Sequence, residues 1–278
     1  MPSIFINLFK KTFAYLTMEK GSFDVFGNIA IVKFQDNVKV KDKIAFARNL
    51  LKSNKSVRTV LEKVGKFHGR LRKQTTKYLA GEKTKETLYR ENGCVFRFNI
   101  DETYFSSRLS NERKEIASKI KKGDKVLVMF AGVSPYSIVI AKLSKAEIVY
   151  SNELNKKAND YAKLNVDLNK LKNRVILVPG DIKRVAEKLS REKMKFDVIV
   201  MPRPQLKDSF LKEAFFLSKK GTRVYYYDFC KETEITEVVE KVKKEAKKAK
   251  KKIKILKVKK AGEIAAYKYR IRVDFKLL

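Results

Sequence analysis

The chain has 278 residues, with 65 lysines and arginines against 31 acidic residues, and a formal net charge of +34. This length permits one large domain or two smaller ones, and the 44% hydrophobic content can supply a core. The charge surplus repels itself in isolation, so it favours a polyanionic partner, nucleic acid first and an anionic membrane second. Two cysteines, Cys94 and Cys230, and one histidine, His68, are too few for a structural zinc site or a secreted disulfide framework. We therefore expect no metal and a cytoplasmic location.

The first twenty residues show no targeting or membrane signal. No apolar run in the chain reaches the roughly 18 residues of a membrane span, so we expect no membrane attachment. Residues 1–17 have apolar bulk, but Lys10 and Lys11 interrupt it and no small-residue cleavage site follows. We interpret residues 1–20 as a vestigial segment ahead of the first folded module.

Residues 21–105 have the pattern of a small, basic α+β domain that could bind RNA. Residues 23–34 (FDVFGNIAIVKF) place a Gly-Asn turn before a dense β-type run. The apolar spacing of residues 42–52 predicts a helix. In residues 87–100, the Asn92-Gly93 pair between two alternating runs predicts a β-hairpin.

From residue 106 to residue 278, predicted strands alternate with predicted helices. Such alternation implies a parallel sheet with right-handed crossovers, and near-continuous apolar strands imply that helices cover both faces. The fold class predicted is therefore α/β, a Rossmann-like domain preceded by a smaller α+β domain. We expect strands at residues 125–130, 147–152, 174–180, 196–201 and 222–229, each followed by a helix, and one or two further strands near the C-terminus.

Residues 241–260 contain twelve lysines and one acidic residue. Two interpretations of this segment remain open. It can be the solvated face of a helix followed by a basic edge strand, or it can be a surface that contacts phosphates.

The ends of the predicted parallel strands carry the groups of a nucleotide site. Ligands of such sheets bind at the carboxyl ends of the strands. The first strand ends in a small-residue turn around Gly132, where a ligand can approach the backbone and the next helix N-terminus. Glu153 ends the second strand and suits a ribose diol, and Asp181 follows the third strand and suits an adenine amino group. The predicted cofactor-binding residues are Phe130, Ala131, Gly132, Val133, Glu153, Leu154, Asp181, Met201 and Pro202.

Three stretches make the chain similar to one family of class I S-adenosylmethionine methyltransferases. Residues 104–113 (YFSSRLSNER), 129–142 (MFAGVSPYSIVIAK) and 225–229 (YYYDF) resemble the archaeal and eukaryotic tRNA (guanine-N1-)-methyltransferases that act at position 37, beside the anticodon. The similarity covers roughly residues 22–278. It implies S-adenosyl-L-methionine as cofactor, the tRNA anticodon loop as partner, and guanosine 37 as target. Some archaeal members also methylate a wyosine precursor, 4-demethylwyosine, at that position.

The chain departs from the family pattern at several positions. The family's turn usually reads Asp-Met-Phe-Ala-Gly-Val-Gly-Pro, whereas Val128 here stands in place of the acid and Ser134 in place of the second glycine. Pro202 stands where the family has the asparagine of an Asn-Leu-Pro motif. The family's extra N-terminal domain, which checks tRNA shape, is expected to be absent or vestigial.

The proposed chemistry needs a base for the guanine N1 proton and a cation for O6. We expect Arg108 to be the cation, and Asp160 and Asp228 are the candidates for the base. RNA contacts are expected from Arg108, Arg113, Tyr136 and Arg203, and the protein is expected to be a monomer. A non-catalytic RNA-binding protein on a decayed scaffold, and an enzyme that acts on ribosomal RNA, remain alternatives.

Overall fold

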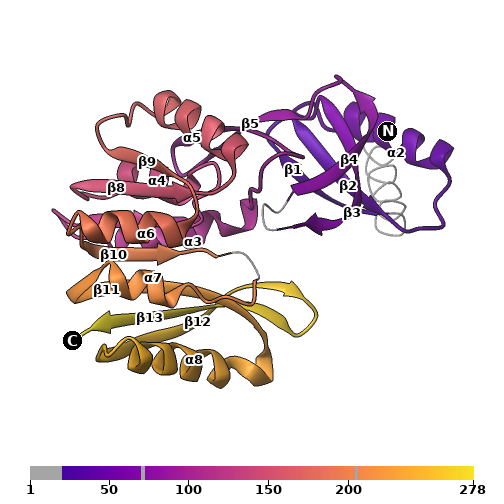
Figure 1. Ribbon diagram of the computed structural model, residues 1–278. Coiled ribbons are helices and arrows are strands. Elements are labelled where there is room, and N and C mark those ends of the chain that lie inside the picture. The colour runs from indigo at the N-terminus through magenta and orange to yellow at the C-terminus, as the bar shows by residue number, and fades with distance from the viewer. Residues whose placement is uncertain (1–20, 70–72, 204–205) are drawn as a thin grey trace, which may run out of the picture. The chain divides into compact units, whose positions relative to one another are not determined.

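The computed structural model describes residues 21–69, 73–203 and 206–278 (Figure 1). The predicted vestigial segment 1–20 lies outside these residues. The chain divides into two compact units. Among the described residues, the N-terminal unit comprises residues 21–69, 73–90 and 97–102, and the C-terminal unit comprises residues 91–96, 103–203 and 206–278.

The N-terminal unit is built on a four-stranded sheet of order β1-β2-β3-β4. The antiparallel β1–β2 pair turns at Gly27, whose φ is +56° and where an added Cβ would lie 2.2 Å from the backbone oxygen of Leu88. Only glycine fits this position. The predicted helix packs its Phe46, Ala47 and Leu50 on the sheet. The elements are β1 Gly21–Phe26, β2 Ile29–Phe34, α2 Val40–Ser53, β3 Thr59–His68 and β4 Lys73–Gly81.

The predicted hairpin is confirmed as β5 Glu86–Glu91 and β6 Cys94–Asn99. Its two turn residues, Asn92 and Gly93, have φ of +50° and +69°. Two consecutive positive φ angles match the right-handed twist of the flanking strands, which is why an Asn-Gly pair is so strong a hairpin signal.

The C-terminal unit confirms the predicted α/β class. Its seven-stranded sheet has the order β12-β13-β11-β10-β7-β8-β9, with β13 antiparallel to both of its neighbours and the remaining neighbours parallel (Figure 1). The strand order reverses at β7, and this is where a doubly wound sheet opens a ligand crevice. The elements are η1 Ser107–Leu109, α3 Ser110–Ser118, β7 Lys125–Val128, α4 Pro135–Leu143, β8 Ile148–Glu153, α5 Lys156–Leu168, β9 Val175–Pro179, α6 Ile182–Arg191, β10 Phe196–Met201, α7 Leu211–Phe216, β11 Ser218–Lys231, η2 Glu232–Glu234, α8 Ile235–Lys248, β12 Ile253–Ala265 and β13 Lys268–Leu277.

Helices α6, α7 and α8 share one apolar core on one face of this sheet (Figure 1). The right-handed crossovers through α4 and α5 run in the opposite direction along the sheet, so these helices cover the other face. Helix α7 is shorter than the pattern of residues 207–218 predicts. Phe210 has a φ of +56°, so the helix cannot extend backwards through it. Residues 241–260 form the end of α8 and the edge strand β12.

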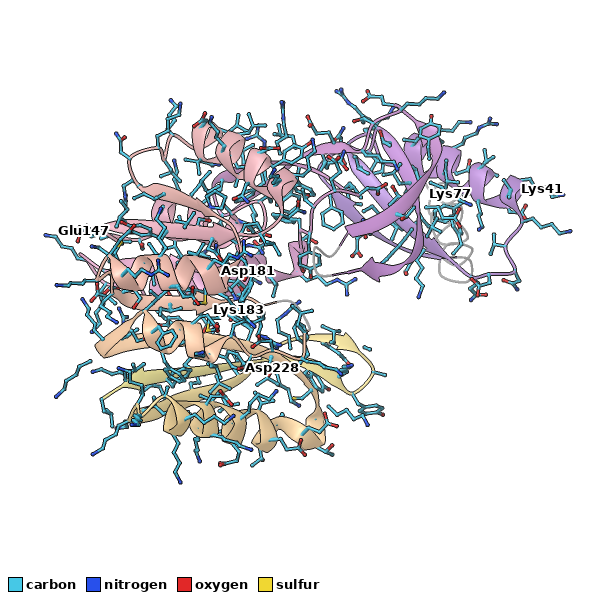
Figure 2. The ribbon with its side chains drawn as sticks, viewed as in Figure 1. Lys41, Lys77, Glu147, Asp181, Lys183 and Asp228 are labelled. Carbon is cyan, nitrogen blue, oxygen red and sulfur yellow. The ribbon has the colours of Figure 1, made fainter. Side chains whose placement is uncertain are left out.

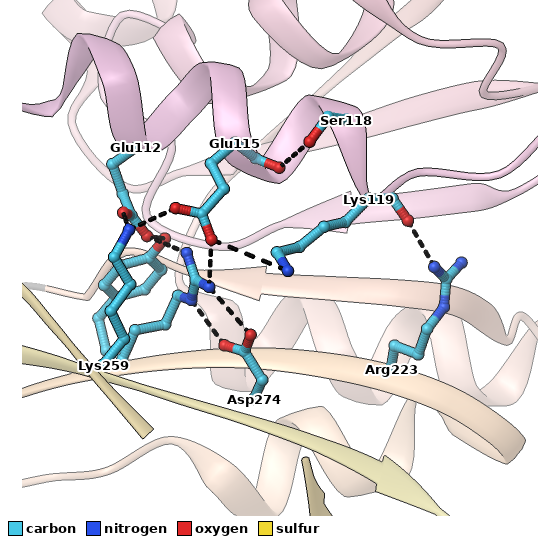
Figure 3. A network of polar contacts seen from close by, with 9 residues as sticks. Glu112, Glu115, Ser118, Lys119, Arg223, Lys259 and Asp274 are labelled. Atoms are coloured by element: carbon cyan, nitrogen blue, oxygen red, sulfur yellow. Dashed lines mark hydrogen bonds and ion pairs between the residues drawn. The ribbon is translucent and has the colours of Figure 1, made fainter. Parts of the chain in front are cut away.

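A buried ionic network joins α3 to the C-terminal hairpin of the same unit (Figure 3). Arg272 has no exposed surface. Its Nε donates to Asp274 Oδ1 at 2.6 Å, and its Nη2 donates to Glu115 Oε1 at 2.7 Å. Its Nη1 donates to Glu112, which also accepts hydrogen bonds from Tyr227 Oη at 2.8 Å and Lys259 Nζ at 2.9 Å. Because the charge of Arg272 is fully desolvated, it requires these carboxylates.

Replacing Glu112 with glutamine should destabilise the fold by about 3 kcal/mol, because it removes a charge that a buried arginine depends on. Urea unfolding measures this difference. The matched control is Glu240→Gln, since Glu240 forms an exposed pair with Lys243 on α8. That variant should change the unfolding free energy by less than about 0.5 kcal/mol. Equal effects of the two substitutions would contradict the network's importance.

Glu115 should make the stability of the protein depend on pH. Burial alone would raise its pKa, but hydrogen bonds from Lys259 and Arg272 outweigh that effect and lower the pKa to about 2. A lowered carboxyl pKa stabilises the fold above the unfolded-state pKa, and this contribution is lost as the pH falls towards the folded-state value. The stability difference between the wild type and Glu115→Gln should therefore shrink from about pH 6 to about pH 3. A difference independent of pH would refute the assignment.

Candidate active site

The turn after β7 holds a rare backbone conformation. Phe130, Gly132 and Ser134 have φ of +58°, +58° and +67°. A Cβ added at Gly132 would lie 3.3 Å from the backbone oxygen of Tyr104, so the turn passes close to the segment before α3. Left-handed backbone in a bulky or polar residue costs on the order of 1 kcal/mol or more and concentrates at functional sites. The turn is therefore a constrained feature of the fold.

Ser134 accommodates the departure from the family's second glycine. Its hydroxyl is hydrogen-bonded to the hydroxyl of Ser151 at 2.8 Å, and Ser137 donates to the same Ser151 oxygen at 2.8 Å. All three serines are buried. The hydrogen bond offsets part of the backbone strain, and it ties the start of α4 to β8. Val128, the other departure in this turn, is fully buried at the end of β7.

Glu153 connects the turn to the end of the second parallel strand. Its Oε2 accepts a hydrogen bond from the Gly132 N–H at 2.7 Å, and its Oε1 accepts one from the Asn155 N–H at 2.8 Å. Burial raises the pKa of Glu153, and these backbone hydrogen bonds partly offset the rise. Each carboxylate oxygen has two lone pairs, so both oxygens keep the capacity to accept a ribose hydroxyl.

Asn152 fixes the end of the third strand beside Glu153. Its Nδ2 donates to the backbone oxygens of Val178 at 2.9 Å and Gly180 at 3.0 Å, and the Gly180 N–H donates to the Glu153 oxygen at 2.8 Å. Asn152 is not among the site residues predicted from the sequence. A polar side chain within the apolar strand segment of residues 147–152 was the signal that could have found it.

A hollow of about 590 Å³ opens beside the end of β9. Leu154, Gly180 and Asp181 line it, together with two cations of α6, Arg184 and Lys188. Asp181 also caps α6, because its Oδ1 accepts a hydrogen bond from the Lys183 N–H at 3.0 Å (Figure 2). Two predicted cofactor residues thus share one cavity. The two cations were not predicted, although their spacing of four residues puts them on one face of the helix.

Several predicted cofactor residues are too buried for side-chain contact with a ligand. Val133 and Met201 have no exposed surface, and Ala131 is 4% exposed. The ring of Phe130 packs against that of Phe210, with centroids 4.9 Å apart. For these residues and the half-buried Pro202, the backbone is the part that a cofactor can approach.

The structure corrects the roles predicted for Arg203 and Asp228. Arg203 is 3% exposed, so it is not a surface contact for RNA. Its Nη1 donates to Asp228 Oδ1 at 2.5 Å, and its Nη2 donates to the backbone oxygen of Asp208 at 2.7 Å. Asp228 also accepts from the Phe229 N–H, from Tyr226 Oη and from Lys241 Nζ.

These partners make Asp228 unsuitable as a catalytic base. Burial alone would raise its pKa, but the charge of Arg203 and the hydrogen bonds from Lys241 and Tyr226 hold the pKa below its ordinary value. The four donors also occupy the lone pairs of the carboxylate. Asp228 is a structural partner of Arg203 that fixes the segment after β10 against β11.

Two further RNA contacts were predicted wrongly, because the side chains are internal. Arg113 is 1% exposed, and its Nε and Nη2 each donate to the Glu91 carboxylate at 2.5 Å. Tyr136 is 3% exposed and donates from its hydroxyl to Tyr227 Oη at 3.3 Å. In this structure, neither side chain offers a surface on which a base could stack or a phosphate could bind.

Arg108 and Asp160 remain exposed near the carboxyl edge. Arg108 lies in η1, just before α3, and the chain runs from α3 into the amino end of β7. Because the end of α3 lies near the amino edge of the sheet, Arg108, before the start of α3, lies towards the carboxyl edge. Asp160 lies in the second turn of α5, which begins after the end of β8. Both therefore stay predictions for catalytic groups.

Within residues 21–69, 73–203 and 206–278, no group of three metal-ligating side chains could hold a metal ion. In the same part of the chain, no helix is long and apolar enough to cross a membrane.

Comparison with known proteins identifies both units of the chain. Residues 87–256 match the TRM5/TYW2 methyltransferase domain, and residues 14–84 match the TYW2 N-terminal domain. The complex of aTrm5 with tRNALeu has a similar fold, with a TM-score of 0.80 and 27% identity over 92% of this chain and 72% of that one.

Two archaeal relatives extend this similarity to sequence. The tRNA (guanine(37)-N(1))-methyltransferase Trm5b of Pyrococcus abyssi is 35% identical over 76% of this chain, which spans 61% of that relative's length. The tRNA (guanine(37)-N(1))/4-demethylwyosine(37)-methyltransferase Taw22 of Nanoarchaeum equitans is 34% identical over 92% of this chain and 100% of its own length. These matches confirm the resemblance seen in the sequence, and the chain belongs to the TRM5/TYW2 methyltransferase family.

Proposed function

We propose that the chain transfers a methyl group from S-adenosyl-L-methionine to N1 of guanosine 37 in tRNA. The observation that carries this proposal is the hydrogen bond between Glu153 and the strained turn at Gly132, at the carboxyl edge of a sheet of this family. The relatives named above are methyltransferases of that position. The ordered turn argues against a decayed scaffold.

The donor set at the carboxyl edge fits the proposed cofactor. Glu153 would accept hydrogen bonds from the ribose hydroxyls, and Asp181 would accept one from the adenine amino group. The hollow beside Leu154 and Gly180 is large enough for an adenine ring, and it is lined by both apolar and polar groups. When bound, the cofactor would supply an already activated sulfonium methyl group.

The remaining chemistry falls to residues of the chain. The N1 proton must leave the guanine, and negative charge develops on O6 as it does. Arg108, which is exposed in η1, is the cation proposed to stabilise that charge. Asp160 is the carboxylate proposed to take the proton, because Asp228 is fully occupied by Arg203 and its other donors.

The partner proposed is the anticodon loop of tRNA. The net charge of +34 provides non-specific attraction to phosphates, and a relative of similar fold was crystallised with tRNALeu. That the protein is a monomer and that it is located in the cytoplasm both stay predictions.

A second target is favoured by one specific observation. The Nanoarchaeum equitans relative, which this chain matches over 100% of its length, is named for both guanosine 37 and 4-demethylwyosine 37. We propose that the wyosine precursor is an additional substrate, since both targets occupy the same position of tRNA.

The decisive experiment measures transfer of labelled methyl from S-adenosyl-L-methionine to two tRNA transcripts that differ only in having guanosine or adenosine at position 37. Label should enter the guanosine transcript alone, because adenosine has a 6-amino donor in place of the O6 acceptor that the proposed cation would contact. Label in both transcripts, or in neither, would contradict the proposed target. A third tRNA that carries 4-demethylwyosine tests the second substrate.

Glu153→Gln should weaken binding of S-adenosyl-L-methionine by about 10- to 100-fold, because a charged acceptor of hydrogen bonds is lost. Isothermal titration calorimetry measures the affinity. The matched control is Glu147→Gln, an exposed glutamate just before β8, at the opposite edge of the sheet (Figure 2). This control should bind the cofactor like the wild type. Unchanged binding by the Glu153 variant would show that the ribose is held elsewhere.

A further inference from the structure

The β12–β13 hairpin turns at the carboxyl edge of the parallel sheet. Strand β11 runs parallel to β10, and the residue at its carboxyl end, Lys231, pairs with Lys268 at the start of β13. The turn of the hairpin, at Ala266 and Tyr267, therefore lies at the same edge as the Gly132 turn and Glu153, with which it shares the C-terminal unit (Figure 1).

Tyr267 at this turn is exposed and strained. It is 77% exposed, the largest fraction among the exposed large hydrophobic residues of the described chain. Its φ is +55°, in the left-handed region that glycine or asparagine normally fills in a tight turn. Nothing in the packing of the fold requires an aromatic ring here. Strain of this kind, in a residue that the core does not use, points to a functional constraint.

The backbone of the tip is held while the ring stays outside. The Glu232 N–H donates to the backbone carbonyl oxygen of Tyr267 at 3.2 Å. Lys260 pairs with Glu232 at 2.5 Å and also lies over the ring of Tyr269, 4.4 Å from its centroid. These contacts hold the backbone of the tip and leave the ring of Tyr267 outside the fold.

The strand leading to the tip is bent. Its register with β13 shifts between Lys260 and Gly262 and again between Glu263 and Ala265. Bulges of this kind bend a strand and re-aim side chains, and they are frequent next to active sites. Two bulges so close to Tyr267 indicate that the bend of β12 sets the direction in which the hairpin tip points.

Cations lie on both strands next to the tip. Lys268 and Arg270 follow Tyr267 on β13, and Lys260 lies further back on β12. The guanidinium of Arg270 lies 5.2 Å from the centroid of the Phe229 ring. An exposed aromatic ring among positive charges matches unpaired nucleotides, whose bases stack on the ring while their phosphates meet the cations. An acidic protein partner would need no such ring at the edge where the base is methylated.

We propose that Tyr267 is a stacking platform for an unpaired base of the anticodon loop next to guanosine 37, with Lys268 and Arg270 contacting the adjoining phosphates. This inference rests on the proposed function for the identity of the RNA. It assigns the hairpin tip the task of holding the loop open, so that the target base reaches the carboxyl edge.

The test uses an anticodon stem-loop RNA with 2-aminopurine at the loop position beside guanosine 37, on either side in separate samples. Stacking on Tyr267 should quench the fluorescence of one of the two labelled RNAs when the wild type binds. Tyr267→Ala should lose this quenching and bind the RNA about 5- to 150-fold more weakly. Tyr267→Phe should retain both, because stacking needs the ring and not the hydroxyl.

The matched control is Phe216→Ala. Phe216 is 45% exposed at the end of α7, near the amino edge of the same sheet, and Lys212 lies 5.5 Å from its ring centroid. Its loss should leave RNA binding and quenching unchanged. Equal effects of the two alanine variants, or no effect of Tyr267→Ala, would overturn the platform.

Methyl transfer by the wild type separates this inference from the proposed function. If the wild type methylates guanosine 37 and Tyr267→Ala behaves identically, the platform is wrong and the proposed function stands. If the wild type transfers no methyl group but quenching still depends on Tyr267, the proposed activity is wrong and the platform stands.

Discussion

The buried charge of Arg272 is the constraint on which the arrangement of the C-terminal unit depends. Its guanidinium donates hydrogen bonds to Glu112 and Glu115 on α3 and to Asp274 on its own strand, β13. Arg272 and Glu112 are 160 residues apart in the sequence. An arginine without solvent is tolerated only where such partners exist, so α3 must lie against this strand in one register. The start and the end of the unit are thereby held together.

This constraint reaches the active site through a chain of hydrogen bonds. Glu112 accepts from Tyr227, whose hydroxyl in turn accepts from Tyr136 on α4. Helix α4 begins at the Gly132 turn, and the segment before α3 supplies the Tyr104 oxygen that closes on that turn. Tyr136, which was predicted as an RNA contact, is therefore a buried residue that fixes the backbone of the candidate site.

The fold was predictable from sequence because its signals are local and repeated. Continuous apolar runs followed by amphipathic segments indicate a parallel sheet covered by helices on both faces. The strand ends then placed Glu153 and Asp181 at one edge. The errors concern burial. Arg113, Arg203 and Tyr136 are residue types common in RNA interfaces, and no local pattern shows that Glu91, Asp228 and Tyr227 lie opposite them. Partners distant in sequence decide whether an arginine is exposed for RNA or buried in an ion pair of the fold.

Arginines and lysines occupy different places in the C-terminal unit. Arg113, Arg203 and Arg272 use their planar, multiply donating groups inside the fold, where fixed geometry matters. The lysines of α8 and β12 stay mostly at the surface and act as point charges. Such charges attract any phosphate chain and carry no sequence information. If the chain binds tRNA as proposed, discrimination must come from the few groups that would meet bases at the carboxyl edge. One exposed tyrosine there would then matter more than many lysines.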